Sequence, residues 1–139
     1  MPEQFQELCF KIGLAVIQGQ KVQFALAYFY SVSKITQHGW TKEQGQQSID
    51  FHLSKPMGVV VTDIEKQISV DSKILQRIKD FKDLRNWLAH DFDQESTSFL
   101  RKGERLADFT LKMDHIINES VGLMQDLDIL GEMMCPTRA

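Results

Sequence analysis

Helix-breaking residues are scarce in this sequence, and this scarcity restricts its fold more than any other feature. Only three prolines occur in 139 residues, and Pro2 and Pro136 lie near the two ends. Pro56 is therefore the single proline in the interior of the chain. Because a proline inside a helix removes a hydrogen bond and clashes with the preceding turn, its absence elsewhere allows long, uninterrupted helices.

Apolar residues recur at alternating intervals of three and four in the first and last parts of the chain. This spacing is typical of a helix with one face against a core, and it predicts long helices over residues 3–36 and 106–134. Ser120 is the only polar interruption of the second stripe. The two stripes consist of Phe5, Leu8, Ile12, Ala15, Gly19, Val22, Leu26 and Phe29, and of Leu106, Phe109, Met113, Ile116, Leu123, Leu127, Leu130 and Met134.

Shorter helices are expected after the first long one. Thr41 and Gln44 have the spacing of a capping pair, which predicts that a helix begins here and extends to about Leu53. Pro56 then suits the start of a short helix over 57–68, although the three consecutive valines in this segment also suit a strand.

The middle of the chain is predicted to hold one more main helix. Asp71 or Ser72 can cap it, and its apolar stripe extends to about His90. The polar stretch 91–98 that follows is expected to be a loop.

These segments predict an all-α, up-and-down bundle of about four long helices plus one or two short ones, in a single domain over 1–139. The content of 42% hydrophobic and 25% charged residues is that of a globular chain and excludes disordered or low-complexity classes. Four helices in this topology place both termini at one end. The long stripes also suit pairing with a second copy, although a core explains them equally well.

Charge and cysteine usage restrict the setting and the partners. The net charge of −3 argues against a surface that follows a phosphate backbone throughout, so any contact with nucleic acid must be local. No signal segment or membrane span is evident, and a cytoplasmic location without membrane association is expected. Cys9 and Cys135 lie far apart in the sequence and are expected to be two buried free thiols, although they can meet if both chain ends lie together.

One charged residue interrupts the stripe of the third main helix. The stripe runs through Ile74, Ile78 and Phe81, and the next step of four reaches Arg85 instead of an apolar residue. Burying a guanidinium without a partner is very unfavourable, so Arg85 must find a carboxylate, extend to an edge, or face a cleft or a partner surface. Asn86 and His90 follow at a spacing that places them, on a continuing helix, beside Arg85.

The segment from Arg85 and Asn86 to His90 resembles the R-N-x-x-x-H motif of the HEPN superfamily, in particular its small HepT-like and abortive-infection members. The resemblance is sharp over about ten residues and otherwise limited to the small all-α architecture. It implies a metal-independent endoribonuclease of a toxin–antitoxin or defence system, working as a homodimer with both motifs facing a shared cleft. It also implies an antitoxin or a nucleotidyltransferase-type protein as partner. Phe92 stands where one branch of the family carries a modifiable Tyr, so modification there is not expected.

The roles that the resemblance implies agree with the chemistry of the side chains. His90 would act as general acid or base, since imidazoles titrate near neutral pH. Arg85 would hold the scissile phosphate, and Asn86 would orient His90 or donate to a phosphate oxygen. No cofactor or metal is expected, because His38, His52 and His115 lack metal-ligand spacing and suit surface or packing positions.

Secondary candidates for RNA contact lie nearby. Lys79 and Lys82 belong to a basic run that leads towards Arg85, and Trp87 can stack on a base, although these residue types more often form a solvated face and a core. A non-catalytic interaction or regulatory module stays open as the alternative function. In that case Arg85 would form an ion pair with Asp83, Asp91 or Asp93, or with a carboxylate on another helix, and His90 would stabilise the helix end.

Overall fold

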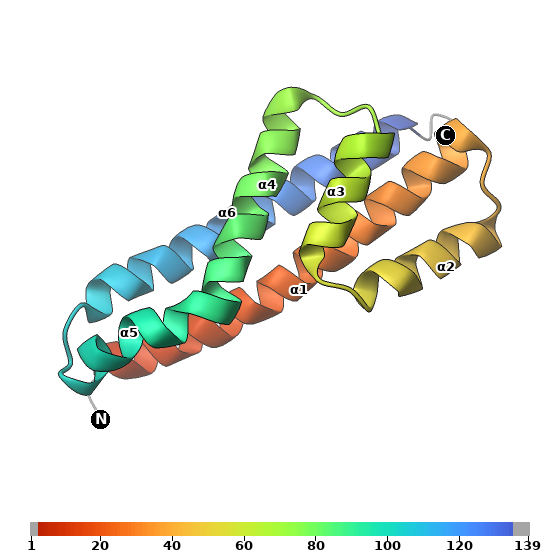
Figure 1. Cartoon of the computed structure of the whole chain (residues 1–139). Helices are drawn as coiled ribbons and strands as arrows, with labels where there is room; N and C mark the ends of the chain where they lie inside the picture. The colour runs from red at the N-terminus through yellow and green to blue at the C-terminus, as the bar shows by residue number, and fades with distance from the viewer. Residues whose placement is uncertain (1–2, 135–139) are drawn as a thin grey trace.

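The computed structural model describes residues 3–134, and every regular element within this range is helical (Figure 1). The predicted all-α bundle is therefore confirmed, and the long first and last helices are confirmed to within a few residues. The elements are α1 (Glu3–His38), α2 (Lys42–Leu53), α3 (Met57–Gln67), α4 (Ser72–Asn86), the π turn η1 (Trp87–Asp91), α5 (Phe92–Arg101) and α6 (Leu106–Met134).

The two long helices α1 and α6 lie side by side and run in the same direction. Three side-chain contacts show this, because the residues they join are always 101 to 103 positions apart. Near the start of both helices the Lys11 ammonium pairs with Asp114 at 2.5 Å. Near their ends the Ser33 hydroxyl lies 3.6 Å from the sulfur of Met134. In the middle, Gln18 Nε2 donates to the hydroxyl of Ser120 at 3.2 Å, which explains the polar interruption of the last stripe.

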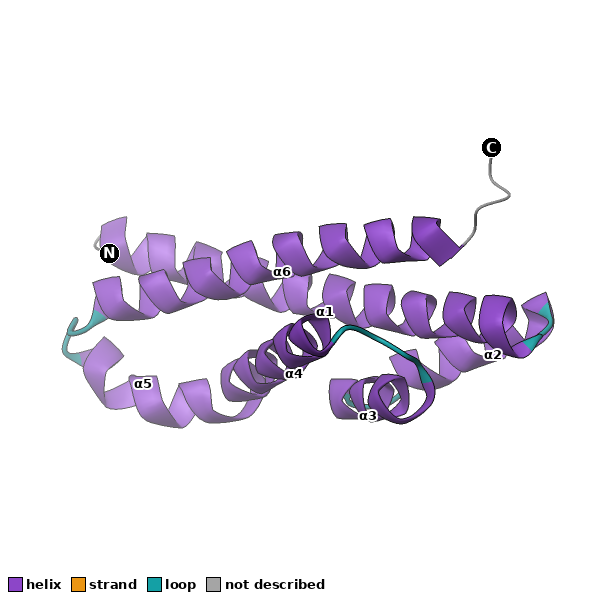
Figure 2. Cartoon of the chain, turned by 90° about the horizontal axis from the view of Figure 1, so that it is seen from above, coloured by secondary structure: helices purple, strands orange, loops and turns teal. Residues whose placement is uncertain are grey.

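The parallel pair overturns the expectation that both termini lie at one end. Glu3 and Met134, the first and last described residues, lie at opposite ends of the α1–α6 pair (Figures 1 and 2). The cause is the additional direction change made by the short helices between α1 and α6, which the four-helix scheme did not include. Cys9 is exposed rather than buried, because it lies outside the apolar stripe of α1. Cys135 lies outside the described residues.

Helices α2 and α3 cover the C-terminal half of α1. The Thr41–Gln44 capping box is present, as predicted, with both reciprocal hydrogen bonds formed. At Gly45 the two helices α1 and α2 approach closely, because a Cβ there would lie 2.7 Å from both Ser31 Oγ and Ile35 Cδ1. The Ser31 hydroxyl uses this proximity to donate to the Gly45 carbonyl at 2.9 Å. The short helix predicted over 57–68 is confirmed as α3.

The expected loop over 91–98 is wrong, because these residues are helical and belong to η1 and α5. Tertiary contacts outweigh the polar composition here. Phe92 is 8% exposed and packs edge-on against Trp87 and Phe109, with ring centroids 5.3 and 5.5 Å apart. Ser96, one turn further on, is also buried. Helices α3, α4 and α5 all lie on the same side of the α1–α6 pair (Figure 2).

Candidate functional site

Arg85 lies in the last turn of α4 and packs against the backbone of α1. A Cβ added at Gly19 would lie 3.3 Å from Arg85 Nε and 3.4 Å from Cδ, so the absence of a side chain at Gly19 makes room for the arginine. Arg85 is half-buried, and this desolvation lowers the pKa of its guanidinium from the ordinary value. The charge is therefore held partly away from water.

None of the ion pairs that the structure forms within residues 3–134 includes Arg85. Of the carboxylates that the sequence offers as partners, Asp83 lies 3.5 Å from the ammonium of Lys82 instead. Asp91 and Asp93 are exposed and form no ion pair in this part of the chain. The structural alternative, in which Arg85 is neutralised by an intramolecular carboxylate, is not found among the described residues.

A π turn, η1, begins directly after Asn86 and contains His90. The amide of Phe92 donates to the carbonyl of Trp87, five residues earlier, which is the hydrogen bond that defines this wider turn. The turn contains His90, and its wider pitch replaces the regular α-helical spacing between Asn86 and His90. Both side chains are exposed and open to a ligand.

The secondary candidates for RNA contact are largely engaged within the protein. Lys79 forms an ion pair with Glu65 of α3, and the Lys82 ammonium lies near Asp83. The indole of Trp87 donates to Glu95, and the Lys112 ammonium lies 3.6 Å from the centroid of its ring.

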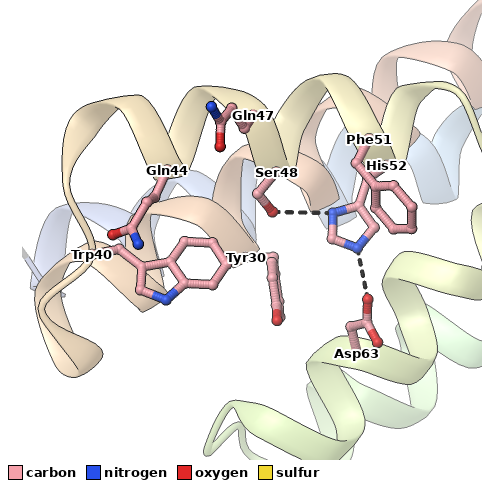
Figure 3. Close-up of a pocket in the computed structure, with 8 residues that line it drawn as sticks. All are labelled: Tyr30, Trp40, Gln44, Gln47, Ser48, Phe51, His52 and Asp63. Atoms are coloured by element: carbon pink, nitrogen blue, oxygen red, sulfur yellow. Dashed lines mark hydrogen bonds and ion pairs between the residues drawn. The ribbon is translucent and has the colours of Figure 1, made fainter.

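A second group of polar side chains surrounds an open pocket of about 410 Å³, to which α1, α2 and α3 contribute residues (Figure 3). His52 of α2 is 2% exposed, and its Nε2 lies 2.8 Å from Oδ2 of Asp63 in α3. Its Nδ1 lies 3.4 Å from the hydroxyl of Ser48. The Ser48–His52 spacing of four is visible in the sequence, but Asp63 comes from another helix, and no sequence pattern connects it to the pair. The pocket is lined by Tyr30, Trp40, Gln44, Gln47, Ser48, Phe51, His52 and Asp63.

Residues 3–134 contain no group of three or more His, Cys, Asp or Glu side chains arranged to hold a metal ion. None of their helices combines the length and the apolarity that crossing a membrane requires. His38 and His115 are exposed, as surface histidines are, whereas His52 is buried.

Comparison of the chain with models of protein families, with curated proteins and with solved structures finds no match.

Proposed function

We propose that the chain is a HEPN-like, metal-independent endoribonuclease whose site consists of Arg85, Asn86 and His90. The observation that carries the proposal is the half-buried guanidinium of Arg85, which forms no ion pair among the described residues. A partly desolvated cation without an internal partner is suited to bind an anion from outside, and a guanidinium binds phosphate bidentately.

The exposed side chains beside it supply the remaining functions. His90 can exchange a proton with a ribose 2′-hydroxyl or with the leaving oxygen, since both its ring nitrogens face no competing partner within residues 3–134. Asn86 can orient that imidazole or donate to a phosphate oxygen. The π turn supports this assignment, because such turns occur frequently at functional sites and this one follows directly after Asn86 and contains His90.

The test is cleavage of end-labelled RNA by the full chain in the presence of EDTA. We expect the wild type to cleave and His90→Ala to lose cleavage by about 100-fold or more, the usual contribution of a general acid or base. His115→Ala is the matched control, because His115 is also an exposed helical histidine. Retained cleavage in His90→Ala with an unchanged circular dichroism spectrum would contradict the proposal.

The second candidate function is a protein-interaction module, and an apolar groove between α1 and α6 favours it. The groove has a volume of about 660 Å³, and Phe24 and Tyr28, which line it, are 51% and 47% exposed. Contiguous exposed apolar surface of this kind marks interaction sites. Lys21 borders the groove on α1, and Glu132 borders it on α6.

The same groove also offers an interface for a homodimer. In a two-fold arrangement Lys21 of one copy would face acidic groups of the other, because charges of both signs border the groove. Phe24 is five positions from Gly19 on α1, so it points about 140° away from the arginine contact. A dimer formed here would leave the two Arg85 sites on separate faces, each acting alone, rather than in the shared cleft that the resemblance implies.

A further inference from the structure

The Ser48, His52 and Asp63 side chains form a continuous hydrogen-bonded series beside the open pocket (Figure 3). Ser48 is half-buried and lines the pocket, whereas His52 behind it is 2% exposed. The Asp63 side chain, at the far end of the series, is 29% exposed. The series lies in α2 and α3 and shares no residue with the Arg85 site.

The hydrogen bonds determine which ring nitrogen of neutral His52 carries the proton. A carboxylate can only accept, so Nε2, at 2.8 Å from Asp63 Oδ2, must carry the hydrogen. The lone pair is then on Nδ1, which faces the Ser48 hydroxyl at 3.4 Å. Ser48 therefore donates its proton towards a base that is itself oriented by a carboxylate. This is the nucleophile–base–orienter arrangement of enzymes that form covalent serine intermediates.

The imidazole is fixed in position by its aromatic neighbours. The ring of Tyr30 lies edge-on to it, with centroids 5.0 Å apart and an interplanar angle of 80°. The ring of Phe51 lies 5.2 Å away at 69°. These contacts keep Nδ1 directed at Ser48. A base must be held in such an orientation before it can accept a proton rapidly.

Ser48 differs from other helical hydroxyl residues of this chain. Ser33, Thr36 and Thr110 each donate to the backbone carbonyl four residues earlier, at 2.7 to 2.9 Å, as helical Ser and Thr commonly do. Within residues 3–134, the Ser48 hydroxyl is hydrogen-bonded to His52 and not to the carbonyl of Gln44. A serine hydroxyl that served only the backbone of its own helix would not be hydrogen-bonded to this imidazole.

The pocket also offers hydrogen-bond donors. Gln44 Oε1 accepts from the backbone amide of Thr41 at 2.9 Å, which fixes the oxygen and leaves the amide nitrogen for a ligand. Gln47 contributes a second side-chain amide to the lining. Side-chain amides can stabilise the oxyanion that develops when a carbonyl is attacked. The remaining walls are the aromatic rings of Tyr30, Trp40 and Phe51.

We propose that Ser48 is an activated nucleophile that accepts the acyl group of a small carboxylic ester with an apolar or aromatic acyl part. The Ser48 Oγ forms a bond to the carbonyl carbon while its proton moves to His52 Nδ1. The bond from that carbon to the alkoxy oxygen then breaks, and His52 returns the proton to the leaving alcohol. Water, activated by the same imidazole, hydrolyses the acyl-serine to the carboxylic acid and restores the hydroxyl.

The experiment is labelling of the full chain with a fluorophosphonate probe, followed by intact mass and peptide mapping. We expect one adduct, on Ser48, which is absent from Ser48→Ala. Ser98→Ala is the matched control, because Ser98 is an exposed helical serine outside the pocket, and it should label as the wild type does. With p-nitrophenyl butyrate, the wild type should release a burst of about one p-nitrophenol per chain, and Ser48→Ala should release none.

The Asp63→Asn substitution distinguishes a Ser48 that is activated by His52 from a Ser48 that is only accessible to the probe. It does so without removing a buried side chain. The new amide can donate to Nε2, which moves the ring proton to Nδ1 and prevents it from accepting from Ser48. We expect labelling to slow by about 100-fold or more. Absence of the adduct, an adduct elsewhere, equal labelling rates in wild type and Asp63→Asn, or labelling without a burst would each overturn the proposal. RNA cleavage by Ser48→Ala should equal that of the wild type, so the two proposals fail or succeed separately.

Discussion

The side chain of Arg85 in α4 lies across the backbone of Gly19 in α1, where a Cβ would come within 3.3 Å of Nε and 3.4 Å of both Cγ and Cδ. These atoms belong to the middle of the arginine rather than to its flexible tip. Adding a methyl group at Gly19 must therefore move Arg85 by a few tenths of an ångström. Gly13, on the same helix, has no atom within 4 Å of such a Cβ and provides a matched comparison.

We predict that Gly13→Ala stabilises the protein by about 0.5–1 kcal/mol, the gain in helix propensity of alanine over glycine. Gly19→Ala should gain less, because displacement of Arg85 opposes the same propensity term, and it should lower RNA cleavage whereas Gly13→Ala should not. Chemical denaturation of both variants measures the difference. Equal stabilisation with equal cleavage would show that the position of Arg85 is not set by Gly19.

Replacing Arg85 by methionine separates a functional arginine from a structural one. The methionine keeps much of the aliphatic packing against α1 and removes a partly desolvated charge that has no ion-pair partner among the described residues. We expect the unfolding free energy of Arg85→Met to be equal to or higher than that of the wild type, and RNA cleavage to be lost.

The control for this substitution is Arg77→Met, which removes the partly exposed ion pair with Asp126. Such pairs contribute about 0–1 kcal/mol, so Arg77→Met should be destabilised slightly and should still cleave RNA. A loss of about 3–5 kcal/mol in Arg85→Met would instead indicate a buried ion pair and a structural arginine.

Deleting Ala89 tests the role of the π turn. Ala89 is exposed and lies within η1, so its removal should convert the wide turn into an ordinary α-helical turn with little loss of packing. We expect helical content to be unchanged and cleavage to be lost, because the deletion shortens the spacing from Arg85 to His90 from five residues to four. Ala89→Gly, which keeps the residue count, should retain cleavage. Cleavage that survives the deletion would show that this spacing has no role.

The sequence predicted those parts of the fold that depend on local signals. The long helices follow from the stripes that include Leu8 and Leu123, and α2 follows from the Thr41 capping box, because helical spacing and caps are properties of neighbouring residues. α5 could not be predicted in this way. Its stability depends on Phe92 packing between Trp87 and Phe109, and Phe109 belongs to another helix.

The same distinction applies to the two candidate sites. Arg85 was singled out because a charge interrupts an apolar stripe, and the structure places it half-buried and without an ion pair among the described residues. The series that ends at Asp63 was missed, because it requires α3 to pack beside α2, which no spacing rule encodes. The π turn was missed as well, since η1 has no composition of its own that distinguishes it from an α-helix.

Tyr30 gives the fold a specific response to alkaline pH. Burial and the nearby charge of Asp63 raise the pKa of its phenol above the ordinary value of about 10. The pKa of Tyr30 is higher in the folded protein than in the unfolded one. The contribution of its protonated phenol to the unfolding free energy is therefore fully present below pH 10. It is then lost as the pH rises through the folded pKa.

The prediction is best tested in Tyr28→Phe, since the chain contains only two tyrosines and Tyr30 is then the single phenol. Its absorbance at 295 nm should show a midpoint above pH 10 in the native protein, and the midpoint should return to about 10 in denaturant. A native midpoint at or below 10 would contradict the burial of Tyr30 against α2 and α3.

The groove between α1 and α6 predicts how self-association responds to a charge. Phe24 is 51% exposed at the groove, and burying a glutamate there against the apolar surface of a second copy would be unfavourable. We expect Phe24→Glu to weaken the dimer by at least tenfold in sedimentation equilibrium, with no loss of helical content. Leu111→Glu is the control, because Leu111 is 67% exposed on α6 but does not line the groove. A wild type that sediments as a monomer, or a dimer that Phe24→Glu leaves intact, would exclude this groove as the interface.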